Sequence, residues 1–123
     1  LNELMQYIQA SSNVNKELIM HYANEMKLDI AANLNKSFFK LSGGMKQKML
    51  IAISLAKKSN IIIYDEPTAN LDPKARDDFY RLLKQNEDDK ILLFVSHRLD
   101  EIKDIVNRQV YMDLGKVISD DRV

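Results

Sequence analysis

The chain of 123 residues is long enough for one small domain with its own hydrophobic core. Its 18 Lys and Arg residues equal its 18 Asp and Glu residues, so the total charge indicates neither a large basic nucleic-acid face nor a polybasic membrane patch. The absence of cysteine excludes disulfides, thiolate metal sites and a cysteine nucleophile. Because its apolar runs are too short to span a bilayer and no signal peptide is visible, we expect a soluble, intracellular chain.

The first forty residues have a helical pattern. Apolar residues spaced by three and four positions predict one helix over residues 1–10 and a second helix after the break at "SSN". The positions that define these helices are Leu1, Leu4, Met5 and Ile8, and then Leu18, Ile19, Tyr22 and Met26. Residues 28–40 show no sustained period, which predicts an irregular connector.

A third helix is predicted over residues 43–58, with Ser42 as its N-cap. Its apolar face consists of Met45, Met49, Ala52, Ile53 and Ala56. The helix opens with Gly43 and Gly44 followed by lysines, and no acidic residue offsets the partial positive charge of its free N–H groups. A bound phosphate would offset it, because paired glycines let a ligand approach the backbone closely. The alternative is a flexible Ser-Gly-Gly loop that merely precedes a helix.

After residue 60 the pattern becomes strand, helix, strand, helix. The apolar runs in "NIIIYDEP" and "ILLFVS" predict two parallel strands that are covered on both faces. Between them, Asp72 as a cap followed by Pro73 predicts a helix that ends near Asn86. The residues of this helix that we expect to be buried are Phe79, Leu82 and Leu83. The following "EDDK" is predicted to be a polar loop.

The C-terminal part is predicted to hold a short helix and a hairpin. Leu99 and Ile102 mark the helix, and "RQVYMDLGKVIS" predicts two antiparallel strands that turn at Leu114 and Gly115. The order of elements indicates an α/β fold, with helices first and a parallel sheet and hairpin after them.

Chemically capable side chains follow both parallel strands. Asp65 and Glu66 end the first strand, and Ser96 and His97 end the second. Ligands bind beyond the carboxyl ends of strands in open parallel sheets, so we expect these residues to share one site. One carboxylate can hold a divalent cation while the next orients or deprotonates an attacking water. The alternative is that these residues only cap the elements that follow.

Four motifs together resemble the ATP-binding-cassette (ABC) ATPases. "LSGGMKQK" is similar to the signature motif of that family, "IIIYDEP" to its Walker B strand, "ANLD" to its D-loop and "SHR" to its H-loop. The resemblance implies a partial P-loop NTPase fold. Residues 1–40 would be a helical subdomain segment, and residues 41–123 the signature helix and the C-terminal part of the ATPase core.

The resemblance also implies roles for individual residues. Asp65 would serve Mg²⁺, Glu66 would polarise the attacking water, and His97 would contact the γ-phosphate of ATP. The signature residues would bind ATP that is held by the opposite subunit of a head-to-tail dimer, and the D-loop aspartate would lie at the dimer seam. These ATP-binding and seam residues are Ser42, Gly43, Gly44, Gln47 and Asp72.

The chain departs from the family pattern in its missing phosphate loop. The motif G-x-x-x-x-G-K-[ST] is absent, since the only glycines are Gly43, Gly44 and Gly115, and no Q-loop precedes the signature. The resemblance therefore implies the C-terminal part of a nucleotide-binding domain, and the start at Leu1 rather than Met agrees with this. We expect this chain alone to be inactive and to leave a strand edge and apolar surface uncovered, so that it self-associates or pairs with the rest of the domain.

The function that the resemblance implies is ATP hydrolysis that energises transport across a membrane. Its partners would be a second nucleotide-binding domain and a transmembrane permease, which would hold the protein at the cytoplasmic face of the cell membrane. The signature and Walker B sequences are closer to exporter-type cassettes, which implies export. The alternatives are a soluble ABC ATPase acting in nucleic-acid maintenance or translation, and a non-catalytic module. We expect no nucleic-acid partner, because the sequence has no basic stripe.

Overall fold

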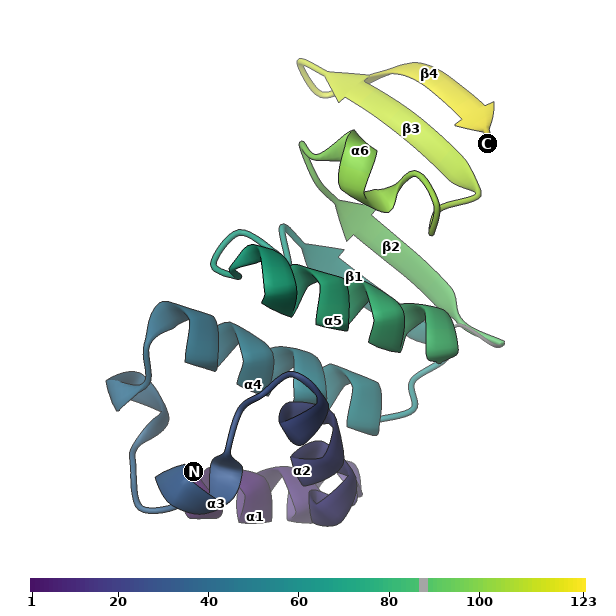
Figure 1. Ribbon diagram of the computed structural model, residues 1–123. Helices are drawn as coiled ribbons and strands as arrows, with labels where there is room; N and C mark the ends of the chain where they lie inside the picture. The colour runs from purple at the N-terminus through teal and green to yellow at the C-terminus, as the bar shows by residue number, and fades with distance from the viewer. Residues whose placement is uncertain (87–88) are drawn as a thin grey trace.

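The computed structural model describes residues 1–86 and 89–123. Helices form a layer at one end of an elongated molecule, two strands and a covering helix lie in the middle, and a hairpin lies at the other end (Figure 1). The chain passes through these layers in sequence order. The predicted α/β order, with helices before the parallel strands and a hairpin after them, is confirmed.

The helical layer begins with the two helices that the periodicity predicts. They are α1 (Asn2–Ser12) and α2 (Lys16–Glu25). Met5 and Ile19 on their inward faces have no solvent exposure, and Leu4, Ile8 and Leu18 are partly buried against the core. The Asn15 side chain caps α2 by accepting a hydrogen bond from the backbone N–H of Glu17.

The connector over residues 28–40 is not wholly irregular, in contrast to our prediction. It contains α3 (Ile30–Asn33) and a single 3₁₀ turn, η1 (Phe38–Lys40). The side chains of Asp29 and Ser37 cap these turns through backbone N–H groups. Caps of this kind stabilise single helical turns without any apolar periodicity, which is why the pattern did not reveal them.

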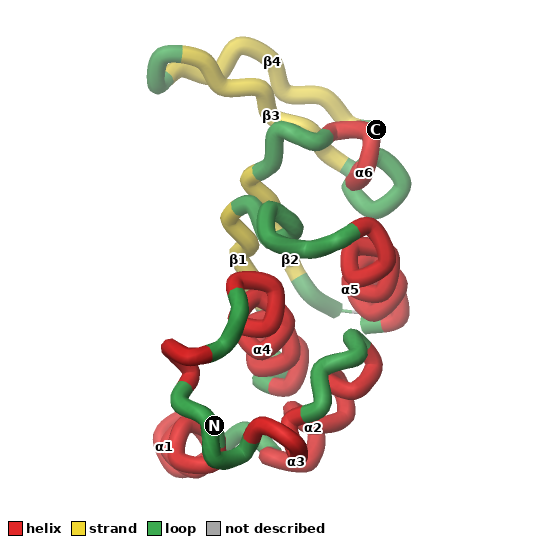
Figure 2. Tube along the Cα trace, turned by 60° about the vertical axis from the view of Figure 1, so that its left-hand side comes forward, coloured by secondary structure: helices red, strands yellow, loops and turns green. Residues whose placement is uncertain are grey.

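The signature helix, α4 (Gly43–Ala56), lies between the helical layer and the sheet (Figure 2). The predicted apolar face is too narrow, because Ile51 and Leu55 are also buried, each 1% exposed. A helix with apolar contacts around most of its circumference is packed on several sides. Helix α4 packs against α2 on one side and against strand residues on the other, where Ser54 Oγ lies 2.9 Å from Tyr64 Oη.

Strands β1 (Ile61–Asp65) and β2 (Ile91–Val95) are parallel, as predicted, and pair in register from Ile61 with Ile91 to Asp65 with Val95. The prediction that they are covered on both faces is wrong for the described residues. Helices cover one face, where Ile62 and Tyr64 are buried. The apolar side chains of the opposite face are each more than half exposed, and they are Ile61, Ile63, Ile91, Leu93 and Val95.

Helix α5 (Pro73–Gln85) covers the buried face of the sheet together with α4. Its predicted cap and its predicted buried residues are confirmed: Asp72 Oδ1 accepts a hydrogen bond of 2.8 Å from Ala75 N, and Phe79 is fully buried with Leu82 and Leu83. The Phe79 ring meets the Tyr64 ring edge-on at a centroid distance of 5.3 Å. Two residues of the predicted "EDDK" loop, Glu87 and Asp88, lie outside the described residues.

The C-terminal segment consists of α6 (Leu99–Ile102) and a hairpin of β3 (Arg108–Asp113) and β4 (Lys116–Arg122). The hairpin turns at Leu114 and Gly115, as predicted, and both residues have positive φ, 49° and 75°. That combination is the two-residue turn whose twist suits antiparallel strands.

One hydrophobic core runs through the molecule from α1 to α5. It joins residues of the helical segment, such as Met26, to residues of α4, β1 and α5, such as Met49, Tyr64 and Phe79. In the described part of the chain, no helix is long and apolar enough to cross a membrane.

Candidate active site

The register of the parallel strands places the two candidate strand ends side by side. Asp65 pairs with Val95, and the backbone N–H of Glu66 donates to Val95 O at 2.8 Å. Just beyond the ends of the two strands, His97 Nε2 lies 3.3 Å from Glu66 Oε1. The structure therefore brings together the carboxylate and the imidazole that the sequence placed at separate strand ends.

Glu66 combines a strained backbone with a buried carboxylate oxygen. Its φ is 46°, a left-handed conformation that costs a non-glycine residue about 1 kcal/mol or more. Its Oε1 atom is buried and, among the described residues, receives no hydrogen bond, because the contact with His97 lacks hydrogen-bond geometry. The side chain as a whole is 31% exposed, so the carboxylate is partly accessible to water.

Asp65 is the residue for which the sequence predicts a role in holding a cation. It ends β1 on the exposed face of the sheet, beside the half-buried Glu66. No cluster of three acidic or His side chains that could hold a metal is found among residues 1–86 and 89–123. This arrangement fits Mg²⁺, which is commonly bound by one or two carboxylates together with substrate phosphates and waters.

The start of α4 is capped but retains donors. Ser42 Oγ accepts a hydrogen bond of 3.1 Å from Met45 N, so the predicted N-cap is confirmed and its hydroxyl proton remains free to donate. A Cβ atom on Gly44 would lie 3.1 Å from Asn70 O, closer than an ordinary contact. Glycine at this position therefore lets α4 approach the segment before Asp72, a packing role that the sequence did not reveal.

Gln47 links the signature helix to the loop after Glu66. Its Nε2 donates a hydrogen bond of 2.7 Å to Pro67 O. Asp72 is exposed and caps α5, so its established contact lies within its own chain. Figure 1 shows on its left side the start of α4, the start of α5 and the end of β1.

Sequence reasoning missed a polar cluster around Glu101 in α6. Its carboxylate contacts Arg76 and Tyr80 of α5, Arg98 next to His97, and Thr68, which lies two residues after Glu66. Burial tends to raise the pKa of Glu101, but hydrogen bonds from Tyr80, Arg98 and Arg76 together hold this pKa below its usual range. The spacing of Arg98 and Glu101 was the available sequence signal.

Residues 2–69 match the protein family described as ABC transporter. The chain is 38% identical over 104 residues to the energy-coupling factor transporter ATP-binding protein EcfA2 of Mycoplasmoides gallisepticum, covering 84% of this chain and 32% of the relative. It is 32% identical over 111 residues to the EcfA2 protein of Staphylococcus aureus, covering 86% and 39%. The chain thus spans about a third of the length of these relatives.

Solved structures share the fold. A cobalt transport ATP-binding protein (cbiO-2) superposes with a TM-score of 0.82 at 20% identity, over 97% of this chain and 45% of that chain. The dimeric bacterial ABC transporter cassette MJ0796 superposes with a TM-score of 0.75 at 28% identity, over 87% and 46%. Both show an ABC ATPase-like arrangement of parallel strands.

This chain belongs to the ATP-binding cassettes of the ABC transporter family. The expectation of export is not supported, because the curated relatives above carry the name of energy-coupling factor transporters. An Atm1-family exporter with ATP bound also superposes, but at 22% identity it shares only the fold.

Proposed function

We propose that the chain is the signature-bearing part of an ATP-hydrolysing subunit in a transporter of the energy-coupling factor class. The observation that carries this proposal is the 3.3 Å contact between Glu66 Oε1 and His97 Nε2 at the ends of two paired parallel strands. A partly exposed carboxylate beside an exposed imidazole suits the attack of water on a phosphate. The names of the relatives support the transporter class.

In this proposal three residues at the strand ends, Asp65, Glu66 and His97, each have one task. Glu66 accepts a hydrogen bond from the attacking water and orients it, and His97 contacts the γ-phosphate of the substrate ATP. Asp65 holds Mg²⁺ directly or through water. Bound there, Mg²⁺ supplies positive charge that offsets the charge developing on the phosphate oxygens.

The start of α4 serves the ATP of a second subunit. The free hydroxyl proton of Ser42 and the backbone N–H groups of Gly43 and Gly44 are donors suited to a phosphate, and Gln47 holds their helix against the loop beside Glu66. Asp72 lies at the seam of this dimer. The partners are a second cassette and a transmembrane subunit, which places the assembly at the cytoplasmic face of the membrane.

The test is Glu66→Gln in the full-length protein. This variant keeps the shape of the side chain and removes the base, so kcat for ATP hydrolysis should fall by about 10²–10⁴-fold. ATP affinity measured by calorimetry should stay within about twofold, since no ground-state contact is lost. Glu25→Gln on α2 is the matched control and should leave both quantities unchanged, because among the described residues this half-buried glutamate pairs with Arg81 alone. Undiminished turnover in Glu66→Gln would remove Glu66 from its proposed task.

A further inference from the structure

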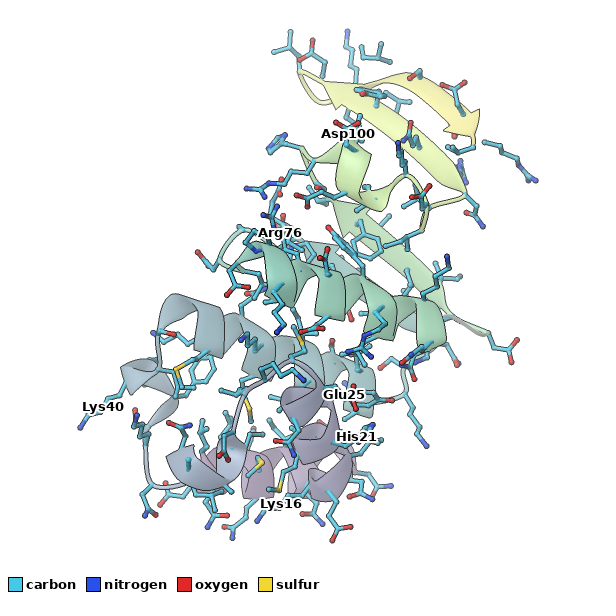
Figure 3. All side chains as sticks on the ribbon, in the orientation of Figure 1. Lys16, His21, Glu25, Lys40, Arg76 and Asp100 are labelled. Atoms are coloured by element: carbon cyan, nitrogen blue, oxygen red, sulfur yellow. The ribbon has the colours of Figure 1, made fainter. Side chains whose placement is uncertain are left out.

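The side chain of Glu101 joins three separate parts of the fold. Its Oε1 pairs with Arg76 Nη1 in the first turns of α5 and lies 3.3 Å from Arg98 Nη1. Its Oε2 accepts a hydrogen bond of 3.1 Å from Tyr80 Oη and lies 3.5 Å from Thr68 Oγ1. Arg76 lies at the start of α5, on the side of that helix toward α6 (Figure 3).

The partners of Glu101 flank the reacting pair on both sides. Thr68 follows Glu66 by two positions and is only 3% exposed, so the loop after β1 is fixed where Glu101 touches it. Arg98 directly follows His97 in the chain. The Glu101 carboxylate therefore contacts both Thr68, which lies near Glu66 in the chain, and Arg98, which lies next to His97.

His97 has little else to hold it in place. Its side chain is 93% exposed, and its contact with Glu66 lacks hydrogen-bond geometry. Among the described residues, two local hydrogen bonds close the loop that carries it: Arg98 N donates to Ser96 Oγ at 3.0 Å, and Glu101 N donates to Arg98 O at 3.1 Å. Helix α6 is a single turn, too short to fix the loop by its own backbone bonds. The position of the loop thus depends on side-chain contacts from α6.

We infer that Glu101 is a positioning residue, which holds the loop of His97 against Glu66 by tying Arg98 to Arg76, Tyr80 and Thr68. The inference rests on the proposed function of Glu66 and His97. Through Arg76 and Tyr80 the same carboxylate fixes that loop to α5, the helix that Asp72 begins. Glu101 itself does not contact the reacting atoms; it acts through His97.

The negative charge of Glu101 is needed for this positioning, because two of its four partners, Arg76 and Arg98, are cations. Glu101→Gln keeps the size of the side chain but removes the ion pairs with Arg76 and Arg98. Without them the Arg98 side chain loses its anchor, and the His97 loop can move away from Glu66. Misplacement of a reacting group by about 1 Å can lower a rate by about 10²-fold.

The experiment measures steady-state ATP hydrolysis by the full-length protein carrying Glu101→Gln, His97→Ala, or both. We expect Glu101→Gln to lower kcat by about 10–100-fold with the KM for ATP unchanged. On the His97→Ala background, Glu101→Gln should lower kcat by less than about twofold further, because a positioning residue has no effect once the group it positions is gone. Glu25→Gln, which breaks the exposed pair with Arg81, is the matched control and should leave kcat unchanged.

Three outcomes would overturn the inference: an unchanged kcat in Glu101→Gln, a rise in KM alone, or an equal loss on both backgrounds. If Glu101→Gln unfolds, Tyr80→Phe tests the same inference, because it removes one hydrogen bond to Glu101 and keeps the fold. We expect Tyr80→Phe to lower kcat by a smaller factor, and to lose this effect on the His97→Ala background. Failure of the proposed function is recognised separately, because Glu66→Gln would then keep full turnover.

Discussion

The helical layer and the parallel sheet use similar apolar side chains in opposite ways. In the helical layer, Met5, Ile19 and Met26 have no solvent exposure. In the sheet, Ile63 is 66% exposed and Ile91 is 63% exposed. The helices surround each other and α4, whereas the strands have helices on one face only. Burial in this chain is decided by which layers are present around an element, and hydrophobicity alone does not decide it.

The sequence of the strands predicts cover on both faces of the sheet, whereas the described residues cover one face. Continuous apolar runs are typical of parallel strands covered on both faces. The exposed face, defined by Ile61, Ile63, Ile91, Leu93 and Val95, is apolar surface of the kind that drives association. The expectation that the chain self-associates remains a prediction, and the following substitutions test the contrast between the two faces.

The largest effect is expected on the covered face. Phe79→Ala should destabilise the chain by about 3–5 kcal/mol, because it removes a fully buried ring that packs on Tyr64 and leaves a cavity. Urea unfolding followed by circular dichroism measures the change. Phe39→Ala, at a position that is 84% exposed, is the matched control and should change stability by less than about 0.5 kcal/mol. Equal losses in the two variants would contradict the layered arrangement.

An intermediate effect is expected where the helical layer meets α5. Tyr22 Oη donates to Asn86 Oδ1 at 3.0 Å, so Tyr22→Phe should cost about 0.5–1.5 kcal/mol. If the two layers share one core, the urea transition should shift as a single step. Tyr7→Phe, at a site 71% exposed on α1, provides the control. A second, separate transition in Tyr22→Phe would show that the layers unfold independently.

The smallest effect on stability is expected on the exposed face of the sheet. Ile63→Ser should change the free energy of unfolding by less than about 0.5 kcal/mol, because the side chain is already in water. Its effect should instead be on association, with a smaller mean mass in sedimentation velocity. Tyr7→Ser removes a similarly exposed apolar group from α1 and should leave the mass unchanged. A wild-type chain that is already a monodisperse monomer would argue against association through this face.

Local signals in the sequence predicted local structure well. The caps at Ser42 and Asp72 and the turn at Leu114 and Gly115 were predictable because each depends on residues within a few positions. The meeting of Glu66 and His97 was predictable because parallel strands bring their carboxyl ends to one edge.

Apart from the locally capped turns α3 and η1, the features that were not predicted depend on contacts between distant residues. Gln47 and Pro67 are 20 positions apart, and Thr68 and Glu101 are 33 positions apart. No periodicity or motif encodes such pairs in a single sequence. The apolar runs alone predicted cover on both faces of the sheet. The missing phosphate loop predicted uncovered apolar surface, and the exposed face of the sheet agrees with that second expectation.

The left-handed backbone of Glu66 has a consequence for how this position could change over generations. Glycine would adopt the φ of 46° without strain, so replacing Glu66 by glycine would relieve a local cost of about 1 kcal/mol. Selection for thermal stability alone would therefore favour replacement of the Glu66 carboxylate by glycine. A library of this cassette screened only for heat resistance should accumulate glycine at position 66, and the same library screened for the proposed ATP hydrolysis should not.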